Sequence, residues 1–186
     1  IDPNDYIGPK GGIPKGWTTD AIRAARDLAR EQGKIPLFPE DAANVLNAAQ
    51  AARAYLKTSQ IAEIFEGARP ELTAVWKEGA VLCKIRPDLW NEKRGILLHV
   101  KTSAGSVAPG AFQRVADSMG YDLAVMFYER GMEAVAPGKL VKSYILAIEQ
   151  EFPHGCKLYD LHELKKEIAA SKVEQAIAVW AKCVAG

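Results

Sequence analysis

The first 70 residues carry apolar and polar positions in a helical pattern. Residues 19–32 begin with threonine and aspartate, which favour a helix start, and a glycine follows their last turn. Residues 38–58 begin with proline and acidic residues and continue with apolar residues three and four positions apart, which predicts a second, longer helix. A third, shorter helix is predicted over residues 59–68. The proline- and glycine-rich residues 1–17 are expected to form an irregular lead-in.

After residue 70 the pattern changes to alternation. Residues 71–79 and 80–88 alternate apolar and polar positions on either side of a Glu-Gly turn, which predicts a β-hairpin. Residues 96–103, ILLHVKTS, are dominated by leucine and β-branched side chains. This composition predicts a central, buried strand.

The second half of the chain combines helical and strand patterns. Helical spacing returns over residues 110–133, and two further strands are predicted at 140–150 and 156–162. Residues 161–184 are then expected to form an amphipathic closing helix. This order predicts one mixed α/β (α+β) domain over residues 1–186, with a sheet of about five strands flanked by helices.

Composition narrows the class of protein. The 186 residues suffice for one domain with a sizeable core, and 48% hydrophobic with 25% charged residues is typical of globular proteins. The net charge of +1 gives no global attraction to nucleic acid, so DNA contact would need a local basic patch. No apolar run approaches the roughly 18 to 20 residues that span a bilayer. No Gly-rich phosphate loop, nucleophile elbow or dinucleotide fingerprint supports a small-molecule enzyme.

The cysteines indicate the compartment. Cys83, Cys156 and Cys183 are odd in number and include no C-x-x-C pair, which argues against a disulfide framework and a zinc site. We therefore expect a reducing cytoplasm. The chain begins at Ile1 rather than methionine, and we expect the full protein to have a further N-terminal segment.

Four polar residues stand where three predicted strands would meet at one edge of the sheet. His99 and Lys101 lie two positions apart in a strand, so their side chains share a face, while Asp88 and Glu71 belong to the preceding hairpin. Carboxylates on adjacent strands are common ligands of Mg²⁺ or Mn²⁺, and a nearby lysine can stabilise charge on a phosphate. The two acids and the lysine indicate a metal-dependent phosphodiesterase, and only the histidine does not fit.

The same stretch resembles a known family. "RPD", an eleven-residue step and "HVK" are similar to the PD-(D/E)XK nuclease pattern. "EGARPELTAVWKEGAVLCKIRPD", "HVKTSAG" and "FQRVADSMGY" resemble the active-site region of the RecE-type exonucleases (exonuclease VIII), and the resemblance covers roughly residues 40–183. It implies a restriction-endonuclease-like core and a metal-dependent DNA exonuclease of phage or prophage recombination in a bacterial host. It also implies Mg²⁺ or Mn²⁺, double-stranded DNA ends as substrate, a ring-like homo-oligomer and a single-strand annealing protein as partner.

The resemblance assigns roles to individual residues. It implies that Glu71, Asp88 and the backbone carbonyl of Val100 are metal ligands, that Lys101 is the catalytic lysine, and that Gln113 orients the lysine or the scissile phosphate. A purely structural role stays open for three of these residues. Glu71 would then be a solvent-facing strand residue, Asp88 a turn cap and Gln113 a helix-surface residue.

His99 departs from the pattern, because the family has aspartate or glutamate there. It is either a substitute metal ligand, since imidazole binds Mn²⁺ better than Mg²⁺, or the mark of a natural loss of activity, or an introduced change. The alternative function is therefore a catalytically weakened or inactive nuclease-fold module that binds DNA or protein.

Candidates for DNA contact surround the motif. A local basic cluster could contact phosphates, and aromatic side chains could stack on a DNA end. The same charges would be ordinary in a hairpin and a turn, and Trp90 fits core packing equally well. The predicted DNA contacts are Lys84, Arg86, Trp90, Arg94 and Tyr121.

Overall fold

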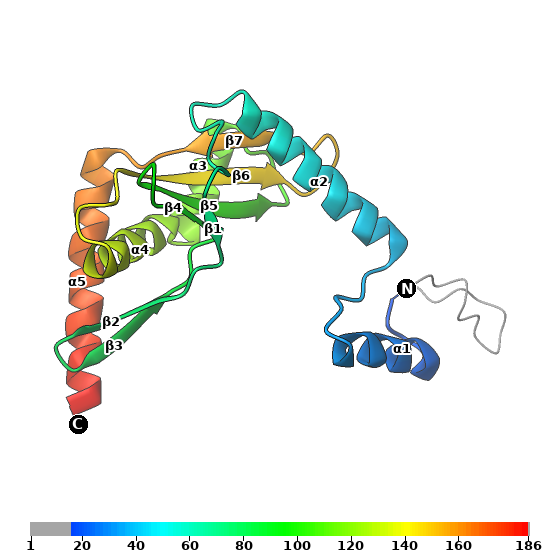
Figure 1. The fold of residues 1–186 in the computed structure, drawn as a ribbon, viewed down its shortest axis with the longest axis horizontal. Helices are drawn as coiled ribbons and strands as arrows, with labels where there is room; N and C mark the ends of the chain where they lie inside the picture. Colours follow the sequence, from blue (N-terminus) through cyan, green and yellow to red (C-terminus); the bar gives the residue numbers. More distant parts are fainter. Residues whose placement is uncertain (1–15, 186) are drawn as a thin grey trace. The chain divides into compact units, whose positions relative to one another are not determined.

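A computed structural model describes residues 16–185 (Figure 1). The chain divides into two compact units at Ala49, within helix α2 (Pro39–Lys57). The first unit contains helix α1 (Asp20–Glu31), which begins where the Thr19 hydroxyl oxygen accepts a hydrogen bond from a backbone N–H of the first turn. Both helices match the sequence prediction. The predicted lead-in lies outside the described residues except for its last two, and the single domain over residues 1–186 stays a prediction.

The second unit is built on a five-stranded mixed sheet in which β5 is the middle strand, as predicted. Strands β5 and β6 are parallel, and the other neighbours are antiparallel. Parallel strands need a long crossover, and residues 104–141 supply it with two helices. In sheet order the strands are β1 (Arg69–Pro70), β4 (Leu89–Asn91), β5 (Ile96–Ser103), β6 (Lys142–Glu149) and β7 (Cys156–Tyr159).

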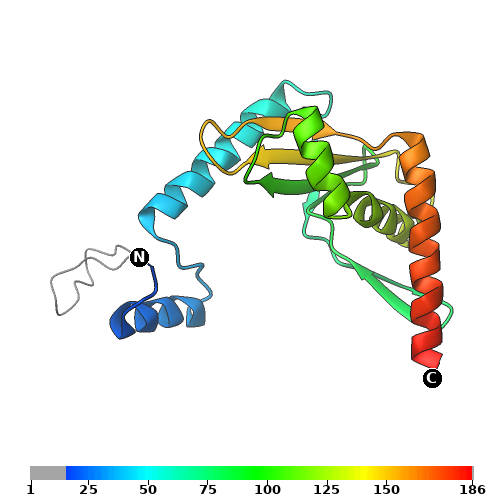
Figure 2. The ribbon, with the colours of Figure 1, turned by 180° about the vertical axis from the view of Figure 1, so that it is seen from behind.

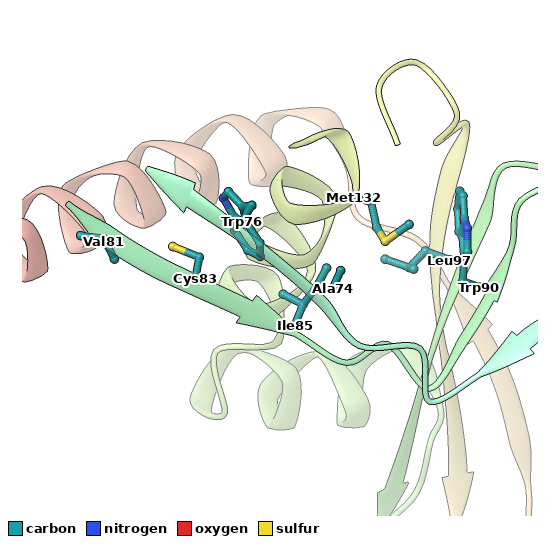
Figure 3. Packing of buried hydrophobic residues seen from close by; sticks show 8 residues of the cluster. All are labelled: Ala74, Trp76, Val81, Cys83, Ile85, Trp90, Leu97 and Met132. Atoms are coloured by element: carbon teal, nitrogen blue, oxygen red, sulfur yellow. The ribbon is translucent and has the colours of Figure 1, made fainter. Parts of the chain in front are cut away.

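The predicted hairpin is present but forms a sheet of its own. Strands β2 (Ala74–Glu78) and β3 (Val81–Ile85) pair only with each other, and the short β1 and β4 take their place in the main sheet. The inward side chains of the hairpin join a core cluster with Trp90, Leu97 and Met132 (Figure 3). Gly131 permits this packing, since a Cβ there would lie 2.7 Å from the Trp76 ring and from Ile85.

The predicted helix over residues 110–133 is two helices. Helix α3 (Pro109–Ser118) ends before Gly120, whose φ of 64° is left-handed, and α4 (Tyr121–Val135) starts in a new direction. Figures 1 and 2 show α3 and the last turns of α2 on opposite faces of the sheet. Helix α5 (Glu163–Ala185) closes the unit as predicted and packs against α4. None of the helices within residues 16–185 is long and apolar enough to cross a membrane.

The helix predicted over residues 59–68 is absent, and this prediction was wrong. The segment forms successive turns with N–H donors bonded three residues back, such as Ile64 to Ile61 at 2.9 Å. The buried Asn91 side chain donates to the carbonyls of Ile64 at 2.8 Å and Glu66 at 3.0 Å. These bonds satisfy carbonyls that a continuing helix would have paired internally.

Candidate active site

Strand β5 presents His99 and Lys101 on one face, toward helix α4. The His99 ring lies edge-on to Tyr128 with 5.0 Å between centroids, and the Lys101 Nζ lies 5.3 Å from the centre of the Tyr121 ring. The two tyrosines are seven residues apart, which is two helical turns, so α4 offers one ring to each side chain. The shared face predicted for His99 and Lys101 is therefore present.

Asp88 joins this pair from the neighbouring strand. The register of β4 on β5 pairs Leu89 with Leu98, so Asp88 comes level with His99. The Asp88 Oδ2 accepts a hydrogen bond from the Val100 backbone N–H at 2.7 Å. Because β4 pairs only as far as Leu98, residues 99–103 of β5 have no strand neighbour on this side within the part of the chain that the structure describes. The Asp88 carboxylate therefore accepts the hydrogen bond that a neighbouring strand would otherwise accept from Val100.

His99 is an uncharged buried side chain at neutral pH. Only 3% of its surface is exposed, and its Nε2 has no hydrogen-bond partner within the described part of the chain. Burial lowers the pKa of His99 from 6.5 to about 4; the Asp88 carboxylate opposes this shift and Lys101 adds to it. The imidazole therefore keeps a lone pair at neutral pH but cannot replace the negative charge of a carboxylate.

Glu71 lies beside Asp88 through its backbone rather than its side chain. It follows β1 in a turn, with a φ of 53°, instead of starting a long strand as expected. Its N–H donates to the Asp88 carbonyl at 3.3 Å. Its exposed carboxylate forms an ion pair with the Arg86 Nε at 2.8 Å. The pair uses Oε2 of Glu71, so a metal could still be bound through Oε1.

Gln113 and Tyr121 lie on the helices over this face. Tyr121 reaches Lys101, as described above. Gln113 is exposed on α3 and lines a separate pocket with Tyr159, and no described contact joins it to Lys101. The expected role of Gln113 beside the lysine stays a prediction.

The predicted DNA contacts differ in burial and in pairing. Trp90 is 2% exposed within the core, so it cannot stack on DNA, and this prediction was wrong. Arg94 is paired with Glu63 and lies 3.9 Å from Glu66, in the turn before β5. Lys84 is exposed on the outer face of the hairpin. Arg86, paired with Glu71, is the basic candidate nearest Asp88 in the chain.

A family described as a PDDEXK-like domain of unknown function (DUF3799) matches residues 31–186. The chain belongs to the DUF3799 family. The PD-(D/E)XK resemblance is thereby confirmed, while the RecE type of this DUF3799 protein stays a prediction. No protein with curated functional data matches the sequence.

A solved structure is similar in fold to the DUF3799 chain. A Eubacterium rectale protein described as a candidate exonuclease is similar with a TM-score of 0.59 at 13% identity, over 89% of this chain and 62% of that one. The DUF3799 chain thus spans less than two thirds of that protein. SSO0001 gives a TM-score of 0.36 at 15% identity, over 84% of this chain and 64% of its own. The family and the mixed sheet confirm the predicted restriction-endonuclease-like α+β fold.

PDDEXK nucleases usually use divalent metal ions, and the DUF3799 site fits such an ion in part. Residues 16–185 hold no group of three or more His, Cys, Asp or Glu side chains able to enclose one. The second oxygen of Asp88 has no protein donor in this range, and the Val100 carbonyl shares the strand edge of its N–H. Mg²⁺ is often held by one or two carboxylates while waters and substrate phosphates complete its shell. The Asp88 carboxylate and the Val100 carbonyl therefore suit a weakly held metal ion.

Tyr128 is the site residue that sequence reasoning missed. It contacts the His99 ring, and its hydroxyl lies 3.3 Å from the Arg86 carbonyl, which accepts its hydrogen bond. The available signal was its spacing, since Tyr128 is two helical turns after Tyr121 and must share its face.

Proposed function

We propose that this protein is a metal-dependent DNA nuclease that hydrolyses phosphodiester bonds, an exonuclease acting on duplex ends. The observation that supports this most is the meeting of Asp88 with the His99–Lys101 face through the 2.7 Å bond to Val100. This bond supports a site in which a carboxylate at an open strand edge acts with a lysine, as in the PD-(D/E)XK pattern. Family membership adds the fold on which such sites occur.

In this mechanism Asp88 and the Val100 carbonyl would hold the ion, and His99 would be a candidate further ligand through Nε2, which has no partner within the described residues. Glu71 would add a ligand through Oε1, or through Oε2 if its pair with Arg86 opens. A bound Mg²⁺ or Mn²⁺ would polarise the phosphate and make water a better nucleophile. Lys101 stabilises the charge that grows on the phosphate, and Tyr121 holds the ammonium in place beneath its ring.

The test is digestion of end-labelled linear duplex DNA with Mg²⁺ and, separately, with Mn²⁺. We expect Asp88→Asn and Lys101→Ala to reduce the rate by roughly 10²-fold or more, as removal of one charge-stabilising group commonly does. Lys172→Ala, which removes an exposed lysine of α5, is the matched control and should cut like the native protein. Undiminished cutting by Lys101→Ala would overturn the assignment.

His99 supports a second candidate function, a nuclease-fold module that binds DNA or protein without cutting. A buried neutral imidazole stands where the pattern needs a negative ligand. His99→Glu separates the two candidates. A native protein that binds duplex DNA without cutting it, together with a His99→Glu variant that cuts, would favour the binding module.

The finer assignments rest on the resemblance to RecE-type exonucleases alone. They are a role in phage recombination, a bacterial cytoplasmic location, a ring-like homo-oligomer around DNA and a single-strand annealing partner. Sedimentation with and without duplex DNA tests the oligomer, and co-purification with an annealing protein tests the partner.

A further inference from the structure

A pocket of about 300 Å³ opens beside helix α3, apart from the site described above. This volume is at the lower end of the range for small-molecule sites. Buried or half-buried apolar side chains form its floor, and exposed or half-exposed polar side chains stand around it. The floor includes Phe112, Ile145 and Tyr159, and the rim includes Gln113, Asp160 and Lys165.

The pocket lies on the same sheet face as the candidate active site. Ile145 pairs with His99 on one side and with Tyr159 on the other, so all three side chains share a face. Two strand spacings separate Tyr159 from His99, about 10 Å, or roughly three stacked nucleotides.

A row of rings connects the pocket floor to the lysine. Tyr159 and Phe112 are stacked with 5.0 Å between centroids and 18° between planes. The Phe112 centroid is 6.1 Å from that of Tyr121, the ring under Lys101. The floor of the pocket and the position of the lysine therefore depend on the same aromatic packing.

The charges at the rim are already compensated. Asp160 pairs with Lys142 at 2.6 Å, and Lys165 pairs with Asp117. The Gln113 amide has no hydrogen-bond partner within residues 16–185, and it offers both a donor and an acceptor. An apolar aromatic floor under an unpaired amide suits an uncharged planar ring with a hydrogen-bonding edge, and not a free phosphate.

We propose that this pocket binds a nucleobase, which lies on the aromatic floor while Gln113 bonds its edge. If the proposed nuclease function holds, the base belongs to the DNA strand a few nucleotides from the cut, and Gln113 influences which sequence is preferred. The role of Gln113 then differs from orientation of Lys101.

The experiment uses 2-aminopurine, a fluorescent base that stacking quenches, with EDTA present so that cutting cannot interfere. The free 2-aminopurine deoxynucleoside monophosphate and a thymidine oligomer carrying one 2-aminopurine are titrated separately, which distinguishes a free nucleotide from a strand. We expect Gln113→Ala to weaken binding about 5-fold, the value of one hydrogen bond. Ala116→Phe, which fills the pocket, should weaken it more than 10-fold, and inorganic phosphate should not compete.

Arg114→Ala is the matched control, because Arg114 is exposed on the same helix and does not line the pocket. Thermal unfolding of each variant separates loss of binding from loss of fold, and Gln113→Ala keeps the test open if Ala116→Phe fails to fold. Equal affinity of native protein, Gln113→Ala and Ala116→Phe, or no quenching by either probe, would overturn the proposal. The protein could show quenching that both variants weaken and yet never cut DNA. That result would support base binding in the pocket and would contradict only the proposed nuclease function.

Discussion

The burial of His99 should make the stability of this protein fall as the solution is acidified. The folded pKa of about 4 lies about 2.5 below the ordinary value of 6.5, which we take for the unfolded chain. Between these values the unfolded chain binds a proton that the folded protein does not, so acid favours unfolding. Above about pH 6.5 neither state is protonated at this residue, and the penalty vanishes.

The size of the effect follows from the two pKa values. At about 1.4 kcal/mol for each pH unit, the penalty reaches about 2 kcal/mol near pH 5 and about 3 kcal/mol near pH 4. His99→Leu removes the titrating ring and the unpartnered Nε2 while keeping an apolar side chain against Tyr128. It should be at least as stable as the native protein near neutral pH, and its advantage should grow by these amounts on acidification.

The assay is urea unfolding of both proteins at a series of pH values, in EDTA. Other acid-sensitive groups are common to both and cancel in the difference between their unfolding free energies. Val75→Ala, which shortens an exposed, non-titrating side chain, is the control, and its difference from the native protein should not change with pH. A His99→Leu difference that stays constant between about pH 7.5 and pH 5 would refute the reasoning.

Three substitutions test the packing, each by urea unfolding. Asn91→Ala should lower the free energy of unfolding by about 2–3 kcal/mol, because the Ile64 and Glu66 carbonyls in residues 59–68 lose their donor. A loss under 0.5 kcal/mol, as is usual for an exposed residue, would contradict this. Gly131→Ala should cost about 1–3 kcal/mol, because the new methyl meets the Trp76 ring, and an unchanged midpoint would show that the core yields freely. Trp90→Ala should cost about 3–5 kcal/mol through a core cavity, and a selective loss of DNA affinity at native stability would restore the stacking role rejected above.

The features that followed from the sequence depend on local periodicity. Side chains alternate between the two faces of a strand, so His99 and Lys101 share a face of β5 regardless of how the rest of the chain folds. The leucine and β-branched residues of 96–103 also predicted a central strand, and its residues 97–99 are buried. Local rules were sufficient for the center of the site.

The features that sequence analysis missed depend on distant partners. Residues 59–68 have a helical pattern, but Asn91, far along the chain, binds their carbonyls. The sequence alone does not show that Arg94 is paired, because its partner Glu63 is brought close only by the fold. Trp90 lies on a three-residue strand that is buried on both faces, and so short a strand shows no alternation to reveal its exposure.

The shortness of β4 has a further consequence, for association between molecules. Within the described residues, β5 has no strand neighbour on that side beyond Leu98, and an open strand edge invites pairing with another chain. Asp88 covers the Val100 N–H and sets a negative charge at the gap, which are two devices that proteins use to protect an edge. Asp88, the proposed metal ligand, therefore also disfavours strand pairing between molecules at this edge. Its replacement by alanine should make the protein self-associate as well as remove the proposed metal ligand.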